Sequence, residues 1–135
     1  MSYSIEKIEG IGPVYGEKLK GIGIVTTGAL LDRAKDPKGR KAVASESGVD
    51  EKMILKWTNM ADLMRIKGVG EEYSELLEAA GVDTVKELKM RNPGNLHKAM
   101  AEANAEKKLV RLLPSEKAVE DWVAQAKDLP AMMTY

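Results

Sequence analysis

The chain has 135 residues, in which 21 lysines and arginines balance 21 aspartates and glutamates, and it contains no cysteine. This length is sufficient for one compact body with its own apolar core, and the absence of cysteine excludes disulfides and thiolate metal sites. The neutral overall charge excludes a strong general attraction to nucleic acid or other polyanions.

The first element predicted along the chain is a short helix followed by a sharp turn. Ile5 and Ile8 are three residues apart, as on one face of a helix. Gly10 and Gly12 then flank Ile11. Because glycine adopts positive φ without strain, we expect the chain to reverse here while the side chain of Ile11 points into the core.

A second helix is expected directly after this turn. Pro13 suits its first position, and Tyr15 and Leu19 lie four residues apart on one face. Gly21 or Gly23 is expected to end the helix, since glycine readily takes the left-handed conformation found at helix C-termini.

Three further helices are predicted in the first half of the chain. Thr26 or Thr27 starts a short helix, and another helix follows the turn at Asp36-Pro37. Asp50 is a suitable N-cap for a third helix, which is expected to run from residue 51 to about residue 62.

The second half of the chain repeats this plan. Residues 66–77 match residues 8–19 without a gap, so that Gly68, Val69 and Gly70 take the places of the first turn. A repeat of this kind predicts two copies of one small supersecondary unit that pack on each other.

The remainder of the second copy also follows the first. Thr84 with Glu87 predicts a capping box at the start of a short helix, and a turn at Asn92-Pro93 precedes the next helix. Ser115 is expected to cap a last helix from residue 116 to about residue 128.

These elements predict two repeats and a tail. The first repeat covers residues 1–62 with a helix that carries Trp57, and the second covers residues 63–130 with an equivalent helix that carries Trp122. Both tryptophans are expected to anchor helix interfaces. No flexible linker separates the repeats, so we expect one rigid body, with a tail at residues 131–135 that frays.

The repeated unit resembles the helix-hairpin-helix motif. The resemblance lies in the Gly-apolar-Gly turn, the small residues Gly16 and Ser74, the leucines Leu19 and Leu77, and the closing glycine. The whole chain resembles a tandem helix-hairpin-helix family of uncharacterised bacterial proteins, which is similar to the helix-hairpin-helix region of β-type DNA polymerases. This resemblance implies an all-α fold of SAM-like or polymerase-β N-terminal type. In it, two tandem repeats, each followed by two to three further helices, pack as one compact bundle.

The resemblance also implies a way of binding DNA. Backbone N–H groups of such a hairpin can hold a phosphate, which reads the DNA backbone and not the bases. The residues expected to bind nucleic acid are the hairpin positions Gly10, Ile11, Gly12, Gly68, Val69 and Gly70, with the side chains of Lys18, Lys20 and Lys67.

The first hairpin is the better candidate of the two. Glu71 and Glu72 follow the second hairpin and would repel a phosphate, so we expect that hairpin to be mainly structural. Residues 33–41, which we call the basic stretch, carry Arg33, Lys35, Lys38, Arg40 and Lys41. This stretch could meet phosphates, or it could be an ordinary solvated loop and helix face.

No set of residues indicates catalysis, a metal or a cofactor. The chain has one histidine, His97, and therefore no second histidine for a metal site. No glycine-rich phosphate loop or paired-carboxylate site indicates nucleotide chemistry. No apolar run approaches the length of a membrane span, and no secretion signal is recognisable. We therefore expect a non-enzymatic cytoplasmic protein without a membrane, metal or cofactor.

Two hypotheses of function follow from the sequence. The first is a module that binds DNA backbone without sequence specificity, mainly through the first hairpin. The alternative is a protein-interaction module or a homodimer or larger homo-oligomer that has kept the fold and lost phosphate binding. The neutral charge and the two glutamates favour the alternative, whereas the double motif and the basic stretch favour DNA.

Overall fold

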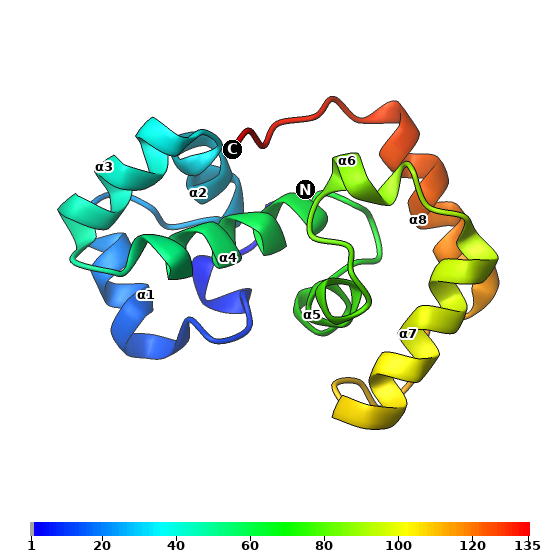
Figure 1. The fold of residues 1–135 in the computed structure, drawn as a ribbon. Coiled ribbons are helices and arrows are strands. Elements are labelled where there is room, and N and C mark those ends of the chain that lie inside the picture. Colours follow the sequence, from blue (N-terminus) through cyan, green and yellow to red (C-terminus); the bar gives the residue numbers. More distant parts are fainter. Residues whose placement is uncertain (1) are drawn as a thin grey trace.

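The computed structural model describes residues 2–135, which fold into short helices joined by tight turns (Figure 1). In chain order these are a 3₁₀ helix η1 (Ile5–Lys7) and the α-helices α1 (Gly12–Lys20), α2 (Thr27–Ala34), α3 (Pro37–Ser47), α4 (Glu51–Leu63), α5 (Glu71–Ala79), α6 (Val85–Leu88), α7 (Pro93–Lys107) and α8 (Glu116–Asp128). The predicted all-α class is confirmed. No helix in residues 2–135 has the length and apolar character that a membrane crossing requires.

Side-chain caps set the starts of most of these helices. The predicted caps are confirmed at α4, where Asp50 accepts a hydrogen bond from the Lys52 amide, and at α8, where Ser115 accepts one from Ala118. The same role is played by Thr26 at α2, Asp36 at α3, Thr84 at α6 and Asn92 at α7. Each cap satisfies an N–H group that the helix itself leaves without an acceptor.

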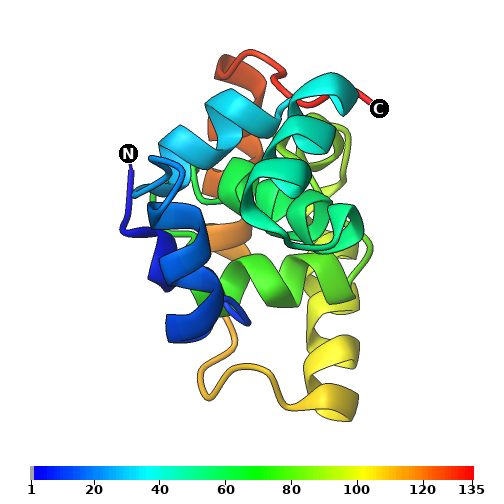
Figure 2. The same ribbon diagram turned by 90° about the vertical axis from the view of Figure 1, so that its left-hand side faces the viewer.

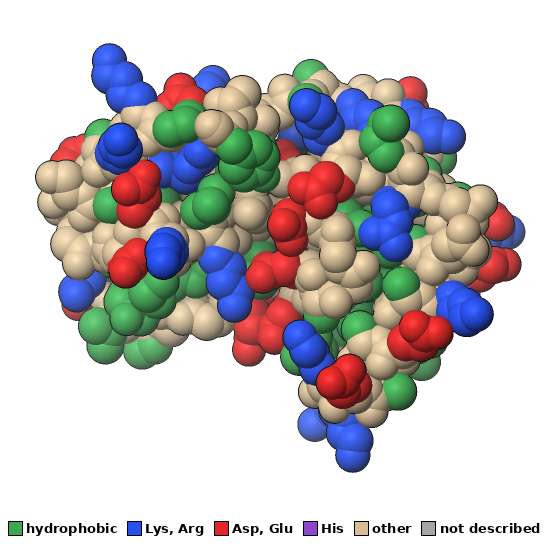
Figure 3. All heavy atoms as spheres, in the orientation of Figure 1, with side chains coloured by type: hydrophobic (Ala, Val, Ile, Leu, Met, Phe, Trp, Pro, Cys, Tyr) green, Lys and Arg blue, Asp and Glu red, His purple; other side chains and the backbone are tan. Residues whose placement is uncertain are grey.

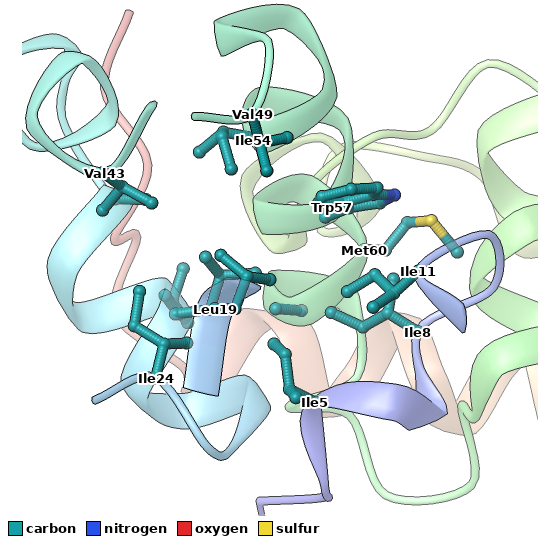
Figure 4. Packing of buried hydrophobic residues seen from close by; sticks show 14 of the residues in the cluster. Ile5, Ile8, Ile11, Leu19, Ile24, Val43, Val49, Ile54, Trp57 and Met60 are labelled. Atoms are coloured by element: carbon teal, nitrogen blue, oxygen red, sulfur yellow. The ribbon is translucent and has the colours of Figure 1, made fainter. Parts of the chain in front are cut away.

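Two apolar clusters form the core. The first joins η1 and α1 to α4, and its residues Ile5, Ile8, Leu19 and Trp57 are at most 2% exposed (Figure 4). The second joins α5 to α8 with Leu63 at the end of α4. Helix α4 packs on α2 and α3 on one side and on α5 on the other, so it connects the two clusters. In Figure 2 the helices of the first cluster face the viewer.

Each cluster contains one tryptophan packed against one tyrosine. The ring centroids are 5.2 Å apart for Trp57 and Tyr15, and 5.3 Å apart for Trp122 and Tyr73. Both tryptophans are buried, at 2% and 3% exposure. Their predicted role as anchors of helix interfaces is confirmed, since each joins the last long helix of its half to the helix after the glycine turn.

The prediction that residues 131–135 fray is wrong. This tail leaves α8 and returns across the molecule to α2 and α3 (Figure 1). The side chain of Met133 is 6% exposed and belongs to the first apolar cluster. The Thr134 amide donates a hydrogen bond of 2.8 Å to the carbonyl of Lys35. Burial of an apolar side chain and main-chain pairing together hold the tail in place.

Arg40 makes hydrogen-bond and cation–π contacts with this tail. It is only 4% exposed, and its guanidinium donates hydrogen bonds to the carbonyls of Ala34 at 3.0 Å and Thr134 at 2.7 Å. The same group lies 5.6 Å from the ring centroid of Tyr135. The Tyr135 hydroxyl in turn donates to Asn59 Oδ1 at 3.0 Å. Arg40 therefore joins α2 to the tail, whose acceptor Thr134 lies 94 residues further along the chain.

A buried carboxylate joins α4 to the second half. Asp62, in the last turn of α4, is 1% exposed. Its Oδ1 accepts a hydrogen bond of 2.8 Å from Arg65, and its Oδ2 accepts one of 2.8 Å from the Val85 amide at the start of α6. Arg65 also donates to the carbonyl of Pro130 at 2.8 Å. Asp62 thus links α4 to α6, and through Arg65 the pair also contacts the segment after α8.

Candidate functional site

Two tight turns follow the plan that the repeat predicts. We call residues 10–12 the first glycine turn, between η1 and α1, and residues 68–70 the second glycine turn, between α4 and α5. Gly10 and Gly68 have φ of 93° and 99°, in the region that favours glycine. The aliphatic residues between the glycines are buried, as expected, with Ile11 at 1% and Val69 at 0% exposure.

The amides of the two aliphatic residues are already in use. Ile11 N–H donates to the Ile8 carbonyl at 3.3 Å, and Val69 N–H donates to the Ile66 carbonyl at 3.1 Å. The prediction that Ile11 and Val69 donate to a phosphate is therefore wrong. Because Ile11 and Val69 are buried, their N–H groups need acceptors inside the protein, and the carbonyls of Ile8 and Ile66 supply them.

The glycine amides are different. Within residues 2–135, the N–H groups of Gly10, Gly12, Gly68 and Gly70 have no hydrogen-bond acceptor from the protein. Gly10 and Gly12 are also exposed. These four amides are the donors that either turn can offer to an external anion.

The two turns differ in conformation and in charge. Gly12 has φ of 62°, whereas Gly70 has φ of −101°, which any residue can adopt. No acidic residue lies in the first turn of α1, while Glu71 and Glu72 lie in the first turn of α5. An anion at the second turn would therefore meet two carboxylates that are missing at the first.

The three lysines predicted for the site differ in the contacts that they make with the rest of the protein. Lys20 forms an exposed ion pair with Glu6, with 2.8 Å between Nζ and Oε1. Lys18 Nζ lies 5.7 Å from the ring centroid of Tyr15 and keeps its donors open to solvent. The backbone of Lys67 is held on both sides by Gln125, which accepts from its amide at 2.8 Å and donates to its carbonyl at 3.0 Å. Of the three, Lys18 is exposed, lies in the last turn of α1 and forms no ion pair within residues 2–135.

The basic stretch does not form one cationic patch. Arg40 is buried and binds the tail, and Arg33 pairs with Glu46 at 2.9 Å. Lys38 and Lys41 stay exposed on α3. The two arginines of the stretch therefore serve the packing of α2, α3 and the tail, which the sequence does not indicate because their acceptors lie far away along the chain.

A cavity of about 350 Å³ lies beside the second glycine turn. It is lined by Gly68 and Gly70, by the first turn of α5, and by Tyr3, Lys7 and Met64. Lys7 comes from η1, so the first half of the chain contributes to the surroundings of the second turn. Sequence reasoning did not find this cavity, since its walls depend on how the halves pack.

An apolar groove of about 460 Å³ adjoins the same turn. Leu112, Leu113, Pro114 and Trp122 form most of its walls, and Leu112 is 77% exposed. The Tyr73 hydroxyl donates to the carbonyl of Leu112 at 3.0 Å, which fixes the loop before α8 against α5. The groove is thus a stable feature with an unusually exposed leucine at its edge.

Two carboxylates on α5 have perturbed acidity. Burial raises the pKa of Glu78, and the nearby carboxylates of Asp83 and Glu75 raise it further against the effect of Lys56. Burial also raises the pKa of Glu75, as does Glu9, the residue before the first glycine turn. Within residues 2–135, Oε2 of Glu78 is buried without any hydrogen-bond partner.

We expect the variant Glu78→Gln to be more stable than the parent at neutral pH. The folded pKa of Glu78 lies above its unfolded value of 4.5, so folding favours the protonated form. The stability that this group contributes is complete below pH about 4.5 and is lost as the pH rises through the folded pKa. Urea unfolding at pH 7 should show a higher midpoint for Glu78→Gln, with a smaller gain at pH 4.

Glu102→Gln, an exposed change on α7, is the matched control and should leave the midpoint unchanged at both pH values. An equal gain at pH 4 and pH 7 would show that ionisation of Glu78 is not the cause.

Within residues 2–135, no group of three or more His, Asp or Glu side chains is placed to hold a metal ion. The ring of His97 is used in packing, with Nε2 lying 2.9 Å from the carbonyl of Pro114. This contact links α7 to the segment before α8.

Comparison with known proteins gives one finding. The family model described as a domain of unknown function (DUF4332) matches residues 9–129. No curated protein and no solved structure matches the chain. The matched range includes both glycine turns and the helices α1 to α8 in full. It does not include η1 or the tail.

Proposed function

The chain belongs to the DUF4332 family, and we propose that it is a non-enzymatic helix-hairpin-helix module that binds DNA backbone without sequence preference, mainly through the first glycine turn. In this proposal η1 and α1 are the two helices of the first hairpin, and α4 and α5 contain those of the second. The second hairpin mainly supports the fold.

One observation carries the proposal. Gly10 and Gly12 are exposed residues at the start of α1, and their amides have no acceptor within residues 2–135. A phosphate oxygen placed there would gain hydrogen bonds and the favourable end of the helix dipole. The absence of acids in the first turn of α1 supports the same position.

The binding should be weak. The net charge is zero, Lys20 is paired with Glu6, and the second turn carries Glu71 and Glu72. A single competent turn contacts about one or two phosphates, so the logarithm of the affinity should fall with the logarithm of the salt concentration with a slope of about −1 to −2.

Fluorescence anisotropy with a labelled DNA duplex tests this proposal. We expect saturable binding at low salt that weakens between about 50 and 200 mM salt, with the same affinity for unrelated sequences. Lys18→Glu should weaken the binding about threefold, because it replaces an exposed cation in the last turn of α1 by an anion and so makes the charge around the first glycine turn less favourable.

Lys98→Glu, an equal charge change at an exposed position of α7, is the control and should have a much smaller effect. If both variants lose affinity equally, the contact is not at the first turn. If the duplex does not bind at low salt, the proposal is wrong.

A second candidate function is an interaction with another protein. It is favoured by the apolar groove beside the second glycine turn and by Leu112 at its edge. Sedimentation velocity at increasing concentration tests the homo-oligomer form of this idea. A concentration-dependent dimer that Leu112→Ser abolishes, together with no DNA binding, would support it over the first proposal.

A further inference from the structure

A third site lies away from both glycine turns, where α4, α5 and the end of α7 meet. Helix α5 lies between α4 and α7 in the fold (Figure 1). The cavity here has a volume of about 230 Å³. We call it the mixed-charge cavity, because its walls are Lys56, Glu75, Glu78 and Lys107 with Ala79 and Leu109. In the view of Figure 3, acidic side chains gather in the middle of the molecule.

The four charged groups of this cavity do not neutralise each other directly. Within residues 2–135, ion pairs shorter than 4.0 Å form elsewhere, and none includes Lys56, Glu75, Glu78 or Lys107. These side chains make no hydrogen bonds to protein either, and Oε2 of Glu78 is buried without a partner. Two half-buried carboxylates and two exposed ammonium groups thus line one hollow without a direct protein partner.

We propose that the mixed-charge cavity binds a small zwitterion of amino-acid size, which carries one primary ammonium and one carboxylate group. The ammonium lies between the carboxylates of Glu75 and Glu78, which line the same wall of the cavity. The carboxylate of the ligand lies toward Lys56 and Lys107. The ligand thereby completes two charge-assisted contacts of opposite sign.

The size and charge of the cavity exclude other ligand classes. Drug-sized ligands fill pockets of about 300–1,000 Å³, so a volume of about 230 Å³ fits a smaller molecule. A calcium ion takes about six to eight oxygen ligands, and two carboxylates flanked by two ammonium groups do not supply them. A simple amine would leave Lys56 and Lys107 unmatched, and a simple carboxylate would leave the glutamates unmatched.

The site shares no lining residue with the proposed DNA contact, although the charge of Glu9, the residue before the first glycine turn, acts on Glu75. Lys18 and the first glycine turn do not line the mixed-charge cavity. Failure of DNA binding therefore leaves this inference intact, and the reverse also holds.

A heteronuclear NMR titration of the full chain tests the inference. The probes are glycine, β-alanine and 4-aminobutyrate, which differ in the separation of their charges, with butylamine and butyrate as analogues that carry one charge each. We expect at least one zwitterion to shift amide signals of α5 and of the end of α7 in a saturable way. The two single-charge analogues should bind at least about tenfold more weakly.

Two variants localise the effect. Glu78→Gln and Lys107→Ala should each weaken binding of the best zwitterion about tenfold. Glu102→Gln and Lys98→Ala, both at exposed positions of α7, are the matched controls and should bind as the parent does. Because Glu78→Gln removes a buried charge, loss of folding does not limit this experiment.

Three results would overturn the inference. The first is the absence of a saturable shift with all three zwitterions. The second is binding of butylamine or butyrate as tight as that of the best zwitterion. The third is unchanged affinity in both Glu78→Gln and Lys107→Ala.

Discussion

Replacement of Asp62 by alanine is expected to lower the free energy of unfolding by about 3–5 kcal/mol. The Asp62 carboxylate is 1% exposed and pairs with Arg65, whose side chain is 14% exposed. Removal of the carboxylate leaves the Arg65 guanidinium without its countercharge and the Val85 amide without its acceptor, both inside the protein. Urea unfolding monitored by tryptophan fluorescence measures the change.

Two further variants separate charge from hydrogen bonding at this position. Asp62→Asn keeps an oxygen for the Val85 amide and should cost less than Asp62→Ala. Asp32→Ala removes an exposed carboxylate that lies 3.7 Å from Lys35, and should change stability by less than about 0.5 kcal/mol. A loss for Asp62→Ala as small as that for Asp32→Ala would show that the buried pair contributes little.

Gly39→Ala is expected to destabilise the protein by about 3 kcal/mol. Gly39 lies in the first turn of α3, where alanine would ordinarily favour the helix by about 1 kcal/mol. Here a Cβ atom would lie 2.0 Å from the carbonyl oxygen of Arg33, which is main chain and cannot rotate away. Thermal and urea unfolding should both show the loss, and the expected sign is opposite to that of helix propensity.

Gly94→Ala is the matched control for this change. Gly94 follows Pro93 in α7 as Gly39 is close to Pro37 in α3. A Cβ on Gly94 would lie 3.2 Å from Oε1 of Glu116, the end of a flexible side chain. We expect Gly94→Ala to change stability by less than about 1 kcal/mol. Similar losses for both variants would contradict the steric explanation.

Local signals in the sequence predicted the helices well. The caps Asp50 and Ser115 place the starts of α4 and α8 correctly, and the ends lie within one residue of the expected positions. These features depend on neighbours within one helical turn, so the sequence contains the whole cause. The inward positions of Ile11 and Val69 follow from the same local pattern.

Contacts between distant residues were the source of the errors. Arg40 was assigned to a basic stretch, but it is buried because Thr134 supplies a carbonyl far along the chain. The sequence indicates only that a helix ends near Asp62, because the hydrogen bond that Asp62 accepts from Val85 depends on the packing of α6. Charge type alone does not reveal a buried partner, since solvated and buried arginines have the same local sequence context.

The candidate site was predictable in part for the same reason. The glycine turns were found from spacing, but the use of the Ile11 amide by the Ile8 carbonyl depends on the geometry of the turn. The difference between Gly12 and Gly70 in φ was also hidden, because glycine permits both conformations. The mixed-charge cavity required three helices to be placed in space.

The docking of Met133 in the first apolar cluster has a consequence for synthesis on the ribosome. Met133 emerges after the whole of the second half, so the nascent first half lacks part of its core until the second half has been synthesised. Domains that are self-contained can fold one after another as they emerge. Here the first half is expected to complete its core only after the second half has emerged, so the final stage of folding is shared by both halves.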